Sequence, residues 1–214
     1  FSAGATIHLA ANTVHHVIAE TGGDSRLALR PASADMAFRS ETGGAVDYYF
    51  FYGPEPTRVV AEYRNLTGAA PLLPRWAYGF WQCRERYASQ QQILDTAAEF
   101  RKRKIPVDVL VQDWQYWGKH GWNAMRFDED HYPDPALLVR ELHALNARFM
   151  LSVWSRVGRE TELGKEIARR NFYIPDTEWV DFFNPEAVDF YCRTQDEELG
   201  KYGIDAWWQD ATEP

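Results

Sequence analysis

From Trp76 onward, the sequence alternates apolar, strand-like segments with amphipathic, helix-like segments. The strand-like segments are residues 76–82, 107–112, 148–154 and 204–209. Alternation of this kind predicts parallel strands joined by right-handed helical crossovers. Two architectures fit the pattern, an open doubly wound sheet and a (β/α)8 barrel.

Helix start signals lie between the strand-like segments. Ser89 opens a capping box in which Gln92 occupies the third helical position. Pro135 and Pro185 each follow a capping residue, Asp or Asn, and suit the first position of a helix. A further amphipathic stretch, residues 161–169, predicts an additional helix after the third strand.

The ends of the strand-like segments distinguish the two architectures. Polar or aromatic residues end each one: Gln82-Cys83-Arg84, Gln112-Asp113-Trp114, Trp154-Ser155-Arg156 and Gln209-Asp210. No glycine-rich phosphate turn follows the first segment, which disfavours a dinucleotide-binding sheet. Barrel enzymes build their sites at the C-terminal ends of the strands. We therefore expect an α/β fold in which residues 75–214 form the first four βα units of a (β/α)8 TIM barrel.

The first third of the chain has a different character. Residues 1–55 lack helical periodicity and alternate short β-type runs, such as 6–9 and 47–52, with turn clusters. This pattern is typical of the end of an N-terminal β-sandwich domain. Residues 56–74 are expected to be a linker, with a short helix at 57–66 followed by a loop.

Composition narrows the possible partners. The formal net charge of −8 disfavours nucleic acid, and no apolar run is long enough to span a bilayer. Aromatic residues, 15% of the chain, suit carbohydrate binding and core packing equally well. The histidines and cysteines that could bind a metal ion are not spaced as metal ligands usually are: His120, His131, His143, Cys83 and Cys192. We expect no metal and no cofactor.

Three carboxylates follow apolar strands. Asp210 and Glu213 end the last one, and glycoside cleavage needs an anion close to the anomeric carbon. Loop capping and a helix start would explain the same two residues without catalysis. Asp113 is expected at the barrel mouth, where it could accept hydrogen bonds from two sugar hydroxyls or form an ion pair with Arg84 or Arg156.

Residues 46–214 resemble glycoside hydrolase family 31. Motifs in matching order and spacing carry the resemblance: 46–54, 73–82, 111–114, 126–128, 132–135, 153–154, Asp181-Phe182-Phe183-Asn184-Pro185 and Trp207-Trp208-Gln209-Asp210-Ala211-Thr212-Glu213-Pro214. The resemblance implies a (β/α)8 barrel that performs retaining hydrolysis of α-linked sugars. By the family pattern, Asp210 would be the nucleophile and Asp113 would bind hydroxyls of the sugar in subsite −1. Trp154 and Trp208 would line that subsite, and Glu213 would be a supporting carboxylate.

Within the family, residues 112–114, the Trp-rich loop after them and residues 207–214 look most similar to bacterial α-xylosidases that act on xyloglucan oligosaccharides. Trp114 or Trp117 could fill the space that the C6 hydroxymethyl of glucose needs, and so exclude hexoses. Two alternatives change the sugar or the acceptor, an α-glucosidase and an α-glucosyltransferase. A third is a sugar-binding module with a degenerate site.

The resemblance also sets expectations for the surroundings of the site. By the family pattern, the general acid/base lies beyond Pro214, and a retaining mechanism needs this second carboxyl about 5–5.5 Å from the first. We therefore expect residues 1–214 on their own to be inactive. The expected partner is an oligosaccharide substrate, and a periplasmic or extracellular setting fits by analogy. The oligomeric state is left open.

Overall fold

The structure is a computed structural model that describes residues 17–20, 27–28, 39–40, 45–49, 51 and 54–212. The chain divides into two units, Phe1–Leu72 and Leu73–Pro214. The second unit contains the strand–helix alternation and the expected site.

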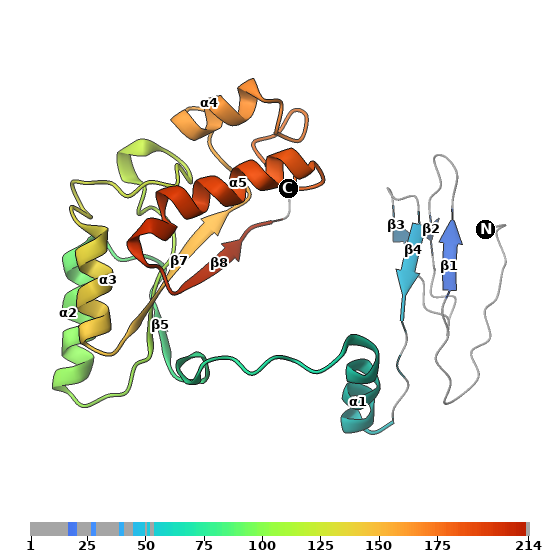
Figure 1. The fold of residues 1–214 in the computed structure, drawn as a ribbon, viewed down its shortest axis with the longest axis horizontal. Helices are drawn as coiled ribbons and strands as arrows, with labels where there is room; N and C mark the ends of the chain where they lie inside the picture. The colour runs from blue at the N-terminus through green and yellow to red at the C-terminus, as the bar shows by residue number, and fades with distance from the viewer. Residues whose placement is uncertain are drawn as a thin grey trace. The chain divides into compact units, whose positions relative to one another are not determined.

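Antiparallel strand pairs occur in the first unit (Figure 1). Strand β1 (Val17–Glu20) pairs with β4 (Ala45–Tyr48), and β2 (Leu27–Ala28) pairs with β3 (Arg39–Ser40). The expected strand at 6–9 lies outside the described residues. The helix expected at 57–66 is α1, which spans Pro56–Thr67. The β-sandwich and its bounds stay a prediction.

A four-stranded parallel sheet forms the centre of the second unit (Figure 1). Its strands are β5 (Trp81–Cys83), β6 (Val109–Gln112), β7 (Arg148–Trp154) and β8 (Ala206–Asp210), paired in the order of the sequence. A doubly wound sheet reverses its strand order at a switch point, whereas a barrel adds each strand beside the previous one. The observed order is therefore that of part of a (β/α)8 barrel, as the sequence predicts.

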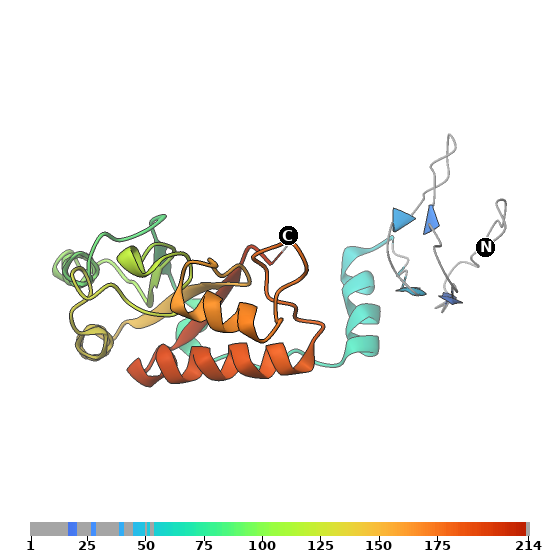
Figure 2. The same ribbon diagram turned by 90° about the horizontal axis from the view of Figure 1, so that it is seen from above.

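Helices connect the successive strands. They are α2 (Gln90–Lys102), α3 (Pro135–Ala144), α4 (Glu162–Arg169) and α5 (Pro185–Glu198). Helices α2 and α3 pack side by side, and α5 runs alongside β7 and β8 (Figures 1 and 2). Short 3-10 turns are η1 (Arg75–Tyr78), η2 (Gly118–His120) and η3 (Gly200–Tyr202). None of the helices in the described part of the chain has the length and apolar character that crossing a membrane would need.

The predicted helix starts are confirmed by their caps. The Ser89 hydroxyl accepts a hydrogen bond from the Gln92 N–H, while the Gln92 side chain accepts from the N–H of Ala88, one residue earlier than a standard capping box. Asp134 and Asn184 cap α3 and α5 in the same way, each before a proline. These helices begin where local side chains satisfy their first N–H groups.

The strand expected at 76–82 is wrong over most of its length. The structure has the 3-10 turn Arg75–Tyr78 there, and β5 begins only after Phe80. The Asp108 carboxylate accepts a hydrogen bond from the Phe80 N–H at 3.0 Å, just before the first pair of the β5–β6 ladder. A side chain at Gly79 would clash with it, because a Cβ there would lie 2.0 Å from Asp108 Oδ2. Sequence periodicity did not anticipate this tertiary contact.

The two faces of the sheet have different surroundings. Successive side chains on a strand alternate between faces, and paired residues of parallel neighbours share a face. One face packs against the helices and builds the apolar core, which includes Leu110, Phe149, Leu151, Val153, Ile93, Leu138 and Leu142. The opposite face, called here the inner face, carries Cys83, Val111, Asp113, Met150, Ser152, Trp154, Trp208 and Asp210.

Candidate active site

The C-terminal edge of the inner face holds two carboxylates. Asp210 ends β8 and pairs in register with Trp154 at the end of β7. Asp113 directly follows β6, which brings it level with Ser152, and Ser152 in turn pairs with Trp208. Because these strands are parallel neighbours, the five side chains lie at one edge of one face.

Asp113 is held in an unusual electrostatic environment. Burial, and then the negative charge of Asp210, raise the pKa of Asp113 to about 6. Glu85 adds a smaller push in the same direction. The nearby Ser152 hydroxyl lowers the pKa of Asp113 and so opposes part of this rise. The hydroxyl itself makes no hydrogen bond of ordinary geometry to any described residue.

Buried acceptor and donor atoms without partners mark the same place. Asp113 Oδ1, Ser152 Oγ and Trp154 Nε1 are all buried and have no hydrogen-bond partner within the described part of the chain. Buried polar atoms are almost always paired in folded proteins. Unpaired acceptors and donors around one carboxylate are typical of a site whose partner is a polar ligand.

The backbone after Asp210 has a strained conformation. Ala211 has a φ of +44°, in the left-handed region that is costly for a residue with a Cβ. Its N–H donates to Asp210 Oδ1 at 2.9 Å, and its carbonyl accepts from the Ser155 hydroxyl at 2.9 Å. These two contacts orient one carboxylate oxygen of Asp210 and leave Oδ2 without a hydrogen bond from Ala211.

Tryptophans form a wall beside the carboxylates. Trp122 is central, with ring centroids 5.2 Å from Trp154, 5.8 Å from Trp114 and 5.5 Å from Trp117. Trp154 and Trp114 are half-buried, whereas Trp117 is 3% exposed and belongs to the core. The Arg156 guanidinium lies 4.9 Å over the Trp122 ring, a cation–π contact that helps to hold this ring in place.

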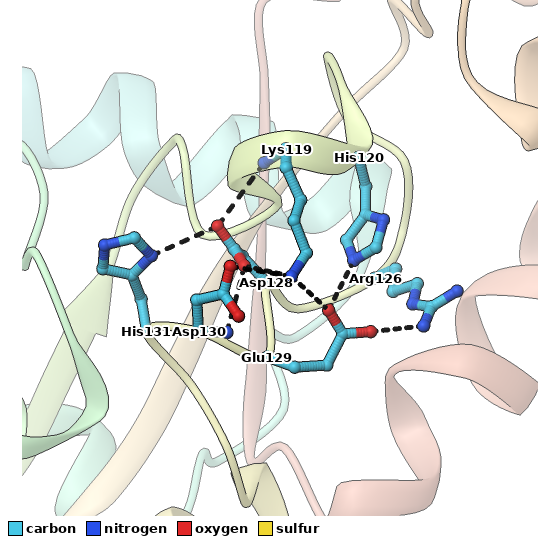
Figure 3. Close-up of polar contacts among 7 residues, drawn as sticks. All are labelled: Lys119, His120, Arg126, Asp128, Glu129, Asp130 and His131. Carbon is cyan, nitrogen blue, oxygen red and sulfur yellow. Dashed lines mark hydrogen bonds and ion pairs between the residues drawn. The ribbon is translucent and has the colours of Figure 1, made fainter.

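Ion pairs hold the loop that carries this wall, residues 113–134, called here the aromatic loop. Figure 3 shows the cluster: Lys119, His120, Arg126, Asp128, Glu129, Asp130 and His131. The buried Asp128 carboxylate accepts hydrogen bonds from the backbone of Asp130 and from His131, which together with Lys119 lower its pKa although burial alone would raise it. His120 contacts the Glu129 carboxylate at 2.9 Å. Both histidines therefore hold carboxylates within the loop, and no group of metal-binding side chains occurs in the described residues.

A family profile matches the whole of the second unit. The profile of the glycosyl hydrolases family 31 TIM-barrel domain covers residues 70–214. The chain belongs to glycoside hydrolase family 31. Both the resemblance stated from the motifs and the barrel expected from the strand order are thereby confirmed.

The relatives in this family include α-xylosidases and an α-glucosidase. The α-xylosidase of Saccharolobus solfataricus is 46% identical over 176 residues, which are 81% of this chain and 24% of that protein. A family 31 α-xylosidase from Xanthomonas citri is 38% identical with a TM-score of 0.73, over 86% of this chain and 22% of that one. Alpha-glucosidase 2 of Bacillus thermoamyloliquefaciens is 30% identical over 198 residues, 86% of this chain and 25% of that protein. This chain thus spans about a quarter of the length of its relatives.

Within this family 31 chain, the residues expected in the site have mostly come together. Asp113, Trp154, Trp208 and Asp210 share one edge of the inner face, and Trp114 adjoins it through Trp122. Glu213 lies outside the described residues. The roles given to all of these residues stay predictions.

Sequence reasoning missed several polar side chains that surround the site. They are Ser152, Ser155 and Asn123. Ser155 had been noted only as one of the polar residues that end the third strand-like segment. Ser152 had a further signal, since it lies two residues before Trp154 and must share its face.

Proposed function

We propose that the protein is a retaining α-glycoside hydrolase in which Asp210 is the nucleophile and Asp113 binds hydroxyls of the reacting sugar. The observation that carries this proposal is the pair of carboxylates at one edge of the inner face, near enough for the charge of Asp210 to act on Asp113. Membership of family 31 supports the same assignment.

Asp210 has the arrangement that a carboxylate nucleophile needs. In the first step, Oδ2 attacks the anomeric carbon while the bond to the aglycone oxygen breaks, and a general acid protonates the departing oxygen. In the second step, water attacks the glycosyl ester and gives its proton to the same group, now acting as a base. The hydrogen bond from Ala211 N–H to Oδ1 orients the carboxylate before the attack. By the family pattern, the acid/base follows residue 214.

Asp113 suits sugar recognition through its free acceptor atom. The buried Oδ1 has no partner among the described residues, so a sugar hydroxyl can take that place without displacing a protein hydrogen bond. A carboxylate accepts from two adjacent hydroxyls at once, which fixes the ring relative to Asp210. Trp154 and Trp208 supply apolar surface for the ring's C–H groups.

For the substrate, we propose α-linked xylose released from xyloglucan oligosaccharides. The likeness to two α-xylosidases supports xylose, while the likeness to an α-glucosidase keeps α-glucosidase and α-glucosyltransferase activity as competing proposals. Trp114 is the better of the two residues considered for excluding hexoses, because Trp117 is buried in the core. Trp114 directly follows Asp113, and its ring is half-buried.

Turnover of aryl α-xyloside and aryl α-glucoside by the full-length protein tests both the proposed reaction and the proposed sugar. We expect a higher kcat/KM for the xyloside and loss of at least about 10³-fold in kcat for Asp210→Asn. A fluorinated xylosyl donor that traps the intermediate should label the peptide that contains Asp210. A label on another residue would refute the assignment. Preference for the glucoside would change the sugar alone, and sugar binding without turnover would indicate a binding module.

A further inference from the structure

One backbone oxygen at the end of β7 accepts two short hydrogen bonds. The Trp154 carbonyl accepts from Asn123 Nδ2 at 2.6 Å and from the Tyr191 hydroxyl at 2.6 Å. Asn123 belongs to the aromatic loop and Tyr191 to α5, and both side chains are buried. Two segments far apart in the sequence therefore hold the same peptide group.

The Asn123 amide also holds a second backbone carbonyl, two residues further along the chain. Its Nδ2 also donates to the Arg156 carbonyl at 3.2 Å, so it spans both sides of Ser155. A side-chain amide can do this because its nitrogen has two protons to donate. The backbone of Asn123 has a φ of +51°, a conformation that asparagine tolerates better than most residues.

Ser155, between the two held carbonyls, reaches the residue after the proposed nucleophile. Its hydroxyl donates to the Ala211 carbonyl at 2.9 Å, and the Ala211 N–H donates to Asp210 Oδ1 at 2.9 Å. A continuous series of contacts thus runs from Tyr191 and Asn123, through Ser155 and Ala211, to the Asp210 carboxylate.

The residue before Asn123 contacts the Trp154 ring. Trp122, which precedes Asn123, meets the Trp154 indole edge to face with centroids 5.2 Å apart. The Arg156 guanidinium covers Trp122 and also pairs with Glu178 at 2.6 Å. The backbone and the ring of Trp154 are both held by the aromatic loop.

We infer that Tyr191 and Asn123 are positioning residues, which hold the end of β7 so that Trp154 and, through Ser155, Asp210 face the sugar together. Neither residue lies among those expected to contact the substrate. This inference rests on the proposed function, because it assigns the two residues a role in that same site.

Two tyrosines allow a matched test in the full-length protein. Tyr191→Phe removes one buried hydroxyl from the Trp154 carbonyl, and Tyr173→Phe removes one from the Val157 carbonyl, where the bond is 2.7 Å. Both variants should lose similar thermal stability. We expect Tyr191→Phe to lower kcat for the aryl α-xyloside about tenfold or more, since small misplacements of reacting groups are costly, with KM changed less than about twofold. Tyr173→Phe should keep kcat within about twofold.

A double-substitution cycle then follows the path to Asp210. If Ser155 transmits the effect, Tyr191→Phe added to Ser155→Ala should lower kcat by less than about twofold more. Full additivity, or equal kcat for Tyr191→Phe and Tyr173→Phe, would overturn the inference while leaving the proposed function intact.

Failure of the proposed function would look different. If the wild-type protein hydrolyses no aryl α-glycoside, that proposal falls, and the tryptophan bands of the near-UV circular dichroism spectrum decide the inference. Tyr191→Phe should alter these bands and Tyr173→Phe should not, because only the first holds a tryptophan at the mouth. Unchanged bands in both variants would overturn it.

Discussion

The carboxylate of Asp210 raises the pKa of Asp113, although the two residues belong to strands separated by β7. Parallel strands bring their C-terminal ends to one edge, and the register places both side chains on the inner face. Burial raises the pKa of Asp113 more than this charge does, and the two together bring it to about 6. A carboxylate held in this way makes both stability and activity depend on pH.

Asp113 should oppose stability at neutral pH. Because its folded pKa lies above the unfolded value, the folded state holds more protons in the intervening range, and stability falls as the pH rises through about 6. Asp113→Asn should therefore raise the free energy of unfolding at neutral pH by about 1 kcal/mol, reduced from the full shift because the side chain is partly solvated. Urea denaturation at pH 7 and at pH 5 measures this, and the gain should shrink at the lower pH.

The same substitution should remove activity. Asp113→Asn is expected to lower kcat/KM at least about 10²-fold, because the amide replaces one of the two acceptor oxygens with an NH2 donor and removes the charge that strengthens the hydrogen bonds from the sugar. In the wild type, kcat/KM should fall as the pH drops through about 6, where Asp113 gains a proton. A flat profile between pH 5 and 7 would count against a substrate-binding carboxylate at this position.

Trp114 should control the choice between xylose and glucose. Trp114→Ala removes the half-buried ring that follows Asp113 in the chain. If this ring excludes hexoses, the ratio of kcat/KM for aryl α-glucoside over aryl α-xyloside should rise about tenfold or more. Trp117→Ala is the contrasting variant, since Trp117 is buried in the core; it should cost about 3–5 kcal/mol of stability. An unchanged ratio in Trp114→Ala would assign the selection to another side chain.

The rate at which Cys83 is alkylated should show whether a sugar occupies the site at the C-terminal edge of the inner face. It ends β5 on the inner face, and burial together with the negative charge of Asp113 raises the pKa of its thiol. Alkylation by iodoacetamide should therefore be slow at neutral pH, speed up as the pH rises, and abolish turnover once complete. Xylose should protect against it. Both thiols are exposed, so a Cys192→Ser background is needed to remove the one on α5. Inactivation that xylose does not slow would contradict this placement.

Gly118 should be required by the aromatic loop. Its φ is +42°, and a Cβ there would lie 2.0 Å from Asp128 Oδ2, so Gly118→Ala should cost about 2 kcal/mol or more. Gly203 is the matched control, with a φ of +82° in the left-handed region and no atom closer to the added Cβ than Val139 Cγ1 at 3.7 Å. Gly203→Ala should cost only about 1 kcal/mol of backbone strain. Equal losses in urea denaturation would show that Asp128 yields easily to the new methyl group.

Features set by neighbouring residues could be predicted from the sequence. The starts of α2 and α3 followed from Ser89 and Asp134, because each cap is satisfied within four residues. Asp113 and Asp210 could be placed at one edge because parallel strands leave no other arrangement. The start of β5 could not be predicted, since it depends on the contact between Phe80 and Asp108, 28 residues apart.

The supporting contacts of the site were also beyond sequence reasoning. The bond from Tyr191 to the Trp154 carbonyl joins residues 37 apart, and nothing in a local pattern indicates it. Trp114 and Trp117 belong to one loop and look alike in sequence, yet Trp114 is half-buried and Trp117 fills the core. Only the folded packing separates them.

Alternation along β7 has a consequence for how the barrel can change. Val153 lies in the apolar core and Trp154 at the mouth, one residue apart on opposite sides of the strand. Inserting or deleting one residue within β7 would exchange the two sides, sending tryptophan and serine into the core and valine and leucine into the mouth. New substrate preferences can therefore arise by altering the loops that follow the strands, while the length of this strand must stay as it is.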